Sequence, residues 1–558
     1  MENIKEIKNC KKCKQDFSFS SDELGFYEKM KVPNPKICPD CRFIMRALFR
    51  NEMSLYSGRK CALCEKNVIS IYNPKSPYVI YCEKCFYSEK WEARDYAMDF
   101  DENRSFLEHY KELLLKVPKI TTYISIGPGP NINSEYINMA GGCKNCYLVF
   151  NTGPAEEVLY SRGAIDVKDS SDLYFGIKVE RCYESINIQH SSGILYGQNI
   201  NSSVDSCFVF NCRNVLNCFG CVNLNNKSHY FLNKPMGADE YTKKVSDILG
   251  SYKKLEEFKK EFEKFILNFP MRENNNIKTV NSTGDYLFSC KNVQKSFEIN
   301  NGEDCHHTHS SKHIKDSIGT IGHGINSEQL LEVVASGYGN NIIGSYAVEN
   351  SSNVLYGFYN RNCKNCIGCD GLKNGQYFIL NKQYSKEEYE RLREKIIKEL
   401  TDLDLYGLMI SYELAPFAYN ETMAQENFPL SKEEALAQGY RWEVDIQKTE
   451  GKETLQTEDI PDHIKDVEDS ITSEILKCIS CKRNYKVIDQ ELLFYRKINI
   501  PISRKCFYCR HQDRVIRRGP YKFWDRNCAK CQKKIITNFA PERPEIVYCE
   551  KCYQQEVY

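Results

Sequence analysis

The chain has 558 residues, 28 of them cysteine, and a net charge of +1. It has no run of about 18 apolar residues that could cross a membrane, and a cysteine pair rather than an apolar segment follows Met1, so we expect neither membrane contact nor a secretion signal. The length predicts about three or four domains. Length and cysteine spacing together argue against a disulfide-rich secreted domain, so we expect a cytoplasmic protein.

The charge is divided unevenly along the chain. Residues 1–90 hold 17 basic and 11 acidic side chains, residues 477–558 hold 19 basic and 8 acidic ones, and the region between them is acidic. Basic ends on an acidic middle predict an anionic partner, such as nucleic acid or a ribonucleoprotein. Thiolates at metal sites would reduce this positive charge without removing it.

Residues 1–90 contain four C-x2-C pairs in two sets. The gap between pairs is 24 residues in the first set, from Cys13 to Cys38, and 17 in the second, from Cys64 to Cys82. Each pair forms a tight knuckle with two thiolates, and two knuckles complete the tetrahedron that Zn²⁺ prefers. Such a site has no open position, so we predict structural zinc, with iron as the alternative metal. The segment is interpreted as a double zinc-ribbon module of the zinc-ribbon or treble-clef type.

Arginines spaced by four residues follow a knuckle in this module and again near the C-terminus. On a helix they would form one basic stripe, which suits phosphate contacts. The alternatives are that they offset the negative charge of the zinc thiolates or that they bind a protein. Phe43, Phe49, Phe523 and Trp524 would suit base stacking if they are exposed. The candidate nucleic-acid contacts are Arg42, Arg46, Arg50, Arg510, Arg514 and Arg518.

The central part of the chain predicts a mainly β fold. Residues 91–120 form a connector whose helix ends at Pro118. Residues 121–270 and 281–400 then alternate short apolar runs with Asn, Ser and Gly; no helical period fits, so we predict short strands. Each run needs its neighbours to cover it, which favours a duplicated β-solenoid, similar to a parallel β-helix, over the alternative of a β-sandwich. A charged helix trails each block.

The two central blocks repeat each other. The stretch from Asn217 to Cys221 reads N-C-F-G-C, and the stretch from Asn365 to Cys369 reads N-C-I-G-C. Each is followed at the same spacing by Asn-Lys and then by a tyrosine. Zinc modules at both ends of such a solenoid would also serve as caps for its exposed ends.

The central region contains residues that predict a further metal site. Cys363, Cys366 and Cys369 form C-x2-C-x2-C, a pattern that can ligate zinc or an iron–sulfur cluster. On a strand, His307 and His309 would share one face and could join a metal site. The alternatives are that the cysteines are small buried side chains and that the histidines form a solvated, His-rich segment.

The last part of the chain repeats the first. Residues 411–475 form an acidic linker that we expect to be partly flexible. Residues 476–558 repeat the double zinc-ribbon module with the same gaps of 24 and 17 residues, and the phrase Y-C-E-K-C occurs at Tyr81 and again at Tyr548. The predicted zinc ligands are Cys10, Cys13, Cys38, Cys41, Cys61, Cys64, Cys82, Cys85, Cys478, Cys481, Cys506, Cys509, Cys528, Cys531, Cys549 and Cys552.

The segment from Cys10 to Arg46 resembles the family of probable zinc-ribbon domains, on its first knuckle, its Phe-rich hairpin, and the phrase C-P-D-C-R that begins at Cys38. The whole chain resembles large, uncharacterised multi-zinc-ribbon proteins of small-genome bacteria. Some of those relatives carry a CoA-transferase (CaiB/BaiF) label, but cysteine-rich modules and short strands do not resemble that α/β enzyme. The resemblance implies architecture and metal ligands only.

Three functions compete at this point. The first is a non-enzymatic, cytoplasmic zinc protein that binds nucleic acid or a ribonucleoprotein through its basic ends. The second is a protein-interaction scaffold built on the solenoid. The third is a β-helix enzyme that acts on a glycan, which predicts grouped carboxylates on one face. No nucleophile elbow, phosphate-binding loop or dinucleotide-binding motif occurs in the sequence.

Overall fold

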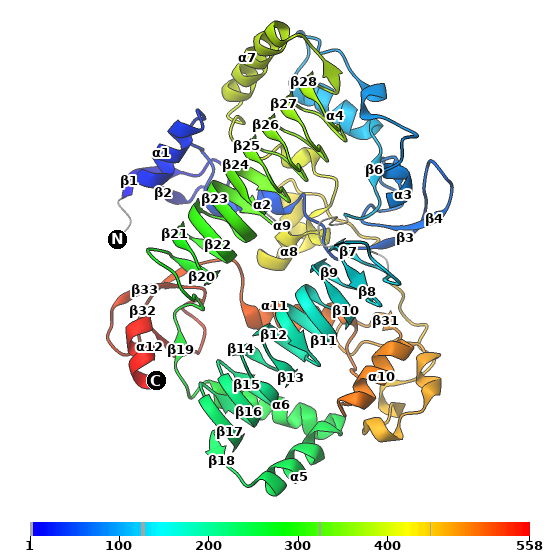
Figure 1. Cartoon of the computed structure of the whole chain (residues 1–558), viewed down its shortest axis with the longest axis vertical. Helices are drawn as coiled ribbons and strands as arrows, with labels where there is room; N and C mark the ends of the chain where they lie inside the picture. Colours follow the sequence, from blue (N-terminus) through cyan, green and yellow to red (C-terminus); the bar gives the residue numbers. More distant parts are fainter. Residues whose placement is uncertain (1–3, 124–128, 323–324, 447, 558) are drawn as a thin grey trace.

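The computed structural model describes residues 4–123, 129–322, 325–446 and 448–557. Two large, mostly parallel sheets, one of 12 strands and one of 10, lie one after the other along the longest axis of the molecule (Figure 1). The prediction of a mainly β fold is confirmed. Sheet 1 consists of β7 (Asn138–Ala140), β8 (Cys143–Lys144), β9 (Phe150–Thr152), β10 (Ala155–Leu159), β11 (Arg162–Glu180), β12 (Tyr183–Gln189), β13 (Ser192–Leu195), β14 (Gln198–Asn201), β15 (Val204–Phe210), β16 (Arg213–Val222), β17 (Asn225–Phe231) and β18 (Lys234–Pro235). Sheet 2 consists of β20 (Gly284–Phe288), β21 (Lys291–Gln294), β22 (Ser296–His306), β23 (His309–Ile321), β24 (Ser327–Val334), β25 (Asn340–Ile343), β26 (Ser352–Leu355), β27 (Lys364–Ile367), β28 (Gln376–Ile379) and β29 (Lys382–Gln383).

Neighbouring parallel strands are offset by twelve residues. In sheet 1, Leu173 pairs with Ser185, and in sheet 2, Val354 pairs with Cys366. Between these corresponding positions every third residue has a positive φ, a conformation that is uncommon outside glycine but that asparagine tolerates well. Asparagines at these corners donate side-chain hydrogen bonds to the asparagine twelve residues on, as Asn353 does to Asn365 at 3.0 Å. The chain therefore turns after every three residues, a period that matches neither a helix nor an extended strand.

The same period of three places small and apolar side chains in the interior. Val149, Val158 and Val167 are buried in the core of sheet 1, and serines at other positions of the same series are buried as well. Ser185, for example, donates its hydroxyl to the carbonyl of Tyr183, two residues earlier, at 2.8 Å. Serine and cysteine fit these positions because each satisfies a nearby backbone carbonyl inside a narrow interior.

Helices cover the outer ends of the two sheets (Figure 1). The glycines of the repeated motif show how: Gly220 and Gly368 have φ values of +66° and +58°, and a Cβ at either would come within 3.0 Å of a phenylalanine ring. That ring belongs to Phe258 of α6 in sheet 1 and to Phe106 of α4 in sheet 2. The trailing helices predicted after each block are present, and helices rather than zinc modules act as the caps. The helices that cover the ends of the sheets are α4 (Phe106–Lys116), which precedes both sheets in the sequence, and the trailing helices α5 (Ala238–Leu249), α6 (Tyr252–Ile266) and α7 (Lys386–Asp402).

The zinc modules lie beside the two sheets, in a crossed arrangement (Figure 1). The N-terminal module packs on sheet 2, because α2 contacts β23 and β24, while the C-terminal module packs on sheet 1, because α11 contacts β11 and β12. Each module also pairs a short strand with the segment that leads into a sheet, β5 with β6 and β34 with β19.

The elements of the modules and of these segments are β1 (Ile4–Asn9), β2 (Asp16–Ser20), α1 (Ser21–Lys29), α2 (Pro39–Ala47), β3 (Tyr56–Lys60), β4 (Asn67–Ser70), β5 (Ile80–Tyr81), α3 (Glu83–Phe86), β6 (Lys119–Ile120), β19 (Met271–Arg272), β30 (Leu476–Lys477), β31 (Asn484–Tyr485), α10 (Asp489–Lys497), α11 (Phe507–Arg518), β32 (Trp524–Asn527), β33 (Lys534–Thr537), β34 (Val547–Tyr548) and α12 (Glu550–Val557).

The acidic segment 411–475 is packed against the rest of the molecule, contrary to the expectation of a partly flexible linker. It contains α8 (Met423–Asn427), α9 (Lys432–Ala437) and several 3-10 turns. Ile464 and Ile471 are buried in the core cluster that covers one end of sheet 1. The charged residues around them, such as Glu468, are exposed. Apolar residues spaced between the acidic ones anchor the segment to the core. The acidic composition alone did not indicate this packing.

Candidate metal centres and the buried arginines

Each zinc finger joins a hairpin to the start of a helix. In the first finger, Cys10 and Cys13 lie in the turn between β1 and β2, Cys38 is the N-cap of α2, and Cys41 lies in its first turn. Proline follows Cys38 directly, which suits the first turn of a helix because the amide there has no intrahelical partner. The other three fingers repeat this layout with β3–β4 and α3, with β30–β31 and α11, and with β32–β33 and α12.

The thiols of each finger converge on one point. In a tetrahedron with Zn–S bonds of about 2.3 Å, the sulfurs are about 3.8 Å apart. All four sulfurs of each finger lie within 4.8 Å of one another. The chain therefore holds four four-thiolate zinc sites, as predicted. Between the two knuckles of each finger, Sγ atoms lie 3.6 Å apart for Cys13 and Cys38, 3.8 Å for Cys64 and Cys82, 3.7 Å for Cys481 and Cys506, and 3.8 Å for Cys531 and Cys549.

Backbone amides favour the thiolate form of one cysteine in the second finger. The N–H of Cys82 donates to Sγ of Cys61 at 3.2 Å. Burial raises the pKa of the Cys61 thiol, but the N–H groups of Cys82, Leu63 and Cys64 outweigh it and lower that pKa to about 6. Because zinc binds the thiolate, a low pKa favours occupancy at neutral pH. The knuckle of the fourth finger does the same for Cys528, whose pKa is also about 6.

Cys363, Cys366 and Cys369 do not form a metal site. Their thiols point into the interior of sheet 2 and donate to the carbonyls two residues earlier, that of Cys363 at 3.3 Å and that of Cys369 at 3.4 Å. Across the described residues, the four zinc fingers are the only groups of three or more Cys, His, Asp or Glu whose ligand atoms converge. The prediction of an extra metal here was wrong because the spacing of C-x2-C equals the three-residue period of the sheet.

The histidines of the same region are also not metal ligands. His307 Nε2 lies 3.0 Å from Glu23 Oε1, and burial lowers the pKa of this imidazole to about 4 even though Glu23 opposes the shift. The ring of His309 stacks on Phe297, with centroids 5.7 Å apart and an angle of 15°. Both side chains are buried, so the alternative of a solvated histidine segment is wrong as well. They belong to the contact between the N-terminal module and sheet 2.

The arginine stripe of α2 faces the inside of the molecule. Arg42 Nη1 donates to Glu332 Oε1 at 2.9 Å and to Tyr27 Oη at 2.7 Å, and Arg46 binds the other oxygen of Glu332. Arg42 and Arg46 are each 1% exposed, and Arg50 is fully buried. These residues cannot contact nucleic acid without unfolding this interface, so that prediction was wrong.

The stripe of α11 makes the corresponding contacts with sheet 1. Arg510 donates to Asp172 at 3.1 Å and to Glu491 at 3.0 Å. Arg514 binds Asp172 at 2.9 Å and Glu184 at 2.8 Å. Arg518 is buried, as Arg510 and Arg514 are. Asp172 and Glu184 occupy positive-φ corners of the sheet, as Glu332 does in sheet 2, so one mechanism attaches both modules.

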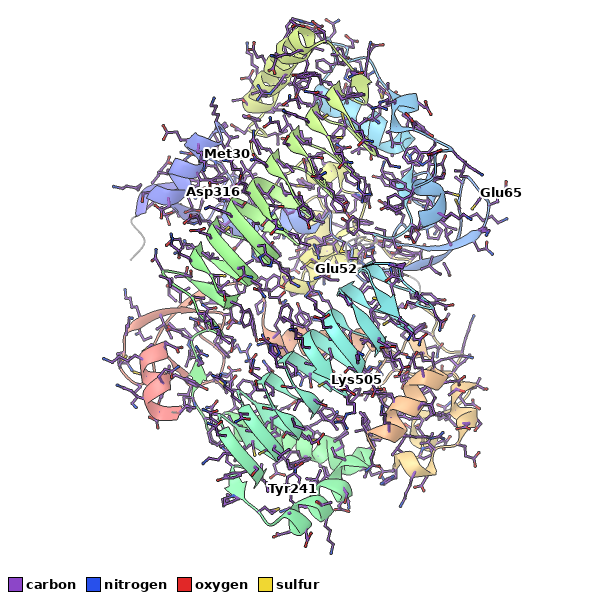
Figure 2. The ribbon with its side chains drawn as sticks, in the orientation of Figure 1. Met30, Glu52, Glu65, Tyr241, Asp316 and Lys505 are labelled. Carbon is purple, nitrogen blue, oxygen red and sulfur yellow. The ribbon has the colours of Figure 1, made fainter. Side chains whose placement is uncertain are left out.

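A buried polar cluster joins all four parts of the molecule. Glu52 of the N-terminal module, which lies between the two sheets in Figure 2, accepts from Arg50 at 2.5 Å and from Arg162 of sheet 1 at 2.7 Å. Arg162 and Arg518 each lie 3.6 Å from Glu298 of sheet 2. Burial raises the pKa of Glu52, but Arg162 and Arg50 outweigh it and lower that pKa to about 2. Glu52 is therefore ionised at neutral pH, and the cluster links both modules to both sheets.

Three of the four aromatic residues near the arginines are packed against other side chains and are not free for base stacking. Phe43 and Phe49 are buried in the core. Phe523 is half-buried and stacks on Phe297, with ring centroids 4.3 Å apart. Trp524 is half-buried too.

The carboxylates that receive the arginines were missed from the sequence. Glu332 lies between two leucines and two valines, an unusual position for a surface acid. A second signal was the three-residue period, which would have placed Asp172 and Glu332 on an outer corner. Neither signal identifies the partner arginine, because the pairs join segments that are far apart in the sequence.

Comparison with known families identifies the first finger. Residues 6–47 match the family model described as Probable treble clef domain. The first finger is a treble clef. Its hairpin, its second knuckle at a helix start, and the same layout in the other three fingers agree with that match. No curated protein matches the chain. In the described part of the chain, no helix is both long enough and apolar enough to span a membrane.

Proposed function

We propose that the protein is a non-enzymatic scaffold: a duplicated β-solenoid whose two blocks are held in one body by zinc fingers. The twelve-residue offset between parallel strands and the regular corners support stacked solenoid rungs. The observation that carries the proposal is the buried cluster of Glu52, Arg162, Glu298 and Arg518, because it joins both zinc modules to both sheets. Zinc then serves assembly and not chemistry.

The working surface of the scaffold is the groove between α6 and the third zinc finger. It encloses about 420 Å³ above aromatic side chains of sheet 1, such as Phe208. Its walls carry both signs of charge, with Lys260 and Glu263 on α6 and Arg504 on the finger. Alternating charges beside an apolar floor suit a protein segment better than a polyanion, which a groove of mixed sign would repel in part.

Nucleic-acid binding remains a second candidate, on different residues from those predicted. Arg483 and Lys486 of the third finger line an aromatic cleft, where Lys486 is exposed. The glycan enzyme has no comparable support: the exposed Glu156 on sheet 1 lies between Lys144 and Lys168 and pairs with both, instead of facing another carboxylate.

The scaffold proposal is tested by affinity purification of the full chain with a charge swap in the groove. We expect K260E/E263K to lose a protein that the wild type retains at stoichiometric amounts. The matched control is E394K/K398E on α7, which swaps the same charges on an exposed face outside the groove. The absorbance ratio at 260 and 280 nm should show clean protein. Two results together would contradict the scaffold and favour the second candidate. Nucleic acid would co-purify with the protein and dissociate in high salt, and the groove variant would retain the same protein partners as the wild type.

A further inference from the structure

The third zinc finger and sheet 1 enclose a cleft of about 570 Å³, which we call the knuckle cleft. Tyr147 and Tyr160 of sheet 1 form one side, and Arg483, Lys486 and Tyr508 of the finger form the other. The volume lies within the range of small-molecule sites, about 300–1,000 Å³. The cleft is separate from the groove beside α6 and from the four zinc centres, although Cys506 touches its edge.

One side of the knuckle cleft is aromatic and rigid. Phe507 stacks on Tyr160, with centroids 5.5 Å apart, and on Phe150, at 5.9 Å. Tyr147 meets Tyr160 edge to face at 5.8 Å and is half-buried, so part of its ring faces the cleft. Tyr160 itself is fixed by a hydrogen bond of 2.7 Å to Glu491. A fixed aromatic surface of this kind suits a flat ring, because little side-chain entropy is lost on stacking.

The other side carries two cations, while the carboxylate of Glu491, which also lines the cleft, is bound by Arg510 and Tyr160. The Arg483 guanidinium lies over the ring of Tyr508, 4.2 Å from its centroid. Lys486 Nζ donates only to the backbone carbonyl of Ser473, at 3.3 Å, among the contacts of the described residues. Both cations therefore keep hydrogen-bond donors for an anionic ligand, and the guanidinium fork matches phosphate oxygens.

The first finger is an internal control for this arrangement. It holds the same four-thiolate site and docks through the corresponding arginine, but it has Gln15 and Ser18 at the positions of Arg483 and Lys486. It also has Asp40 at the position of Tyr508. Neither zinc binding nor docking therefore requires the cationic and aromatic residues of the third finger.

We propose that the knuckle cleft binds a nucleoside phosphate, with the base against Tyr147 and Tyr508 and the phosphate between Arg483 and Lys486. Two sources share this chemistry, a free mononucleotide and the unpaired end of a single strand. The proposal does not rest on the scaffold function, because the cleft and the groove beside α6 use different residues.

The test uses the zinc-loaded full chain and two probes at low salt, fluorescent hexauridylate by anisotropy and the four nucleoside monophosphates by calorimetry. R483Q/K486S gives the third finger the residues of the first, and we expect it to weaken binding at least about tenfold. It should also lower the dependence of log K on log salt by about 0.7, because the two cations neutralise the one phosphate that lies between them. Y147A should weaken binding by about fivefold or more without changing that slope.

The matched control is K386S/K398Q, which removes two exposed lysines from α7, at the far end of sheet 2 (Figure 1). It should change affinity less than about twofold by the screening of distant surface charges. Zinc content and melting temperature verify that each variant is folded. Binding of a monophosphate identifies the free nucleotide as the source, and binding of the oligonucleotide alone identifies a single-strand end. No binding of either probe, or equal losses in R483Q/K486S and K386S/K398Q, would overturn the proposal. Failure here leaves the protein-partner assay of the scaffold unaffected, so the two proposals fail separately.

Discussion

The C-x2-C spacing occurs in two regions of this molecule and has a different physical meaning in each. In the zinc fingers it closes a knuckle, and the sulfurs of two knuckles meet at 3.6–3.8 Å. In sheet 2, Cys363 and Cys366 are three residues apart because the chain turns every three residues, and each thiol binds its own backbone. What separates the two cases is a second pair, 17 or 24 residues away, that can complete a tetrahedron.

The comparison also explains why zinc is placed where it is. The fingers are short hairpins and helices that bury little apolar surface on their own, so metal supplies their stability. The sheets have a continuous interior and need no metal. Each finger in turn positions a helix whose arginines bind carboxylates at corners of a sheet. Metal binding and the joining of the two sheets are therefore expected to be coupled.

The largest effect should follow from breaking a knuckle. In C38S the first finger loses a ligand and its zinc, and α2 no longer has a fixed start from which Arg42 and Arg46 reach sheet 2. We expect one zinc fewer per chain and a free energy of unfolding lower by more than about 4 kcal/mol. Elemental analysis and denaturant unfolding measure the two quantities. Full zinc content in C38S would contradict the assignment of this ligand.

A smaller loss is expected where the finger helix meets the sheet. E332Q leaves Arg42 and Arg46 buried with one neutral partner, and breaking a buried ion pair in this way costs about 3–5 kcal/mol. The zinc content should stay at the wild-type value. The control is E328Q on the same strand, where the side chain is exposed. Equal midpoints of unfolding for the two variants would show that the buried pair does not hold the interface.

The contact between the C-terminal module and sheet 2 should depend on pH. Asp285 is buried and accepts from Asn538 at 2.7 Å, and burial raises its pKa to about 6 from 3.8. A raised pKa means that the contribution of this group to stability is complete below pH 3.8 and is lost as the pH rises through 6. As the pH rises from 5 to 7, we expect the free energy of unfolding of D285N to increase by about 1–2 kcal/mol relative to that of the wild type. Unfolding midpoints of both proteins across that window measure the gain, and a difference independent of pH would contradict it.

The smallest effect is expected for the cysteines of the sheet interior. C366S keeps a group that can donate to the carbonyl of Lys364, as buried serines elsewhere in the interior do. We expect a loss of about 1 kcal/mol or less and unchanged zinc content. A lost metal ion in C366S would remove the distinction between the two kinds of C-x2-C pair.

The sequence was sufficient for the zinc ligands because paired knuckles at matched gaps leave few other structures. It was not sufficient for the arginines. The helical spacing of Arg42 and Arg46 was right, but spacing alone cannot tell whether a stripe faces solvent or a distant carboxylate such as Glu332. The three-residue period was also hidden, because serine, cysteine, valine and isoleucine all fill the interior and no simple apolar pattern results. The cleft residues Arg483 and Tyr508 stood out only once sheet 1 was seen beside them.

The measurement that tests the central claim most directly is the zinc content of the purified full chain, wild type beside C363S/C366S/C369S. Four zinc ions per chain in both proteins are expected, because only the sixteen knuckle cysteines converge among the described residues. More than four metal ions in the wild type, reduced to four in the triple variant, would contradict the account and restore a metal site to the interior of sheet 2.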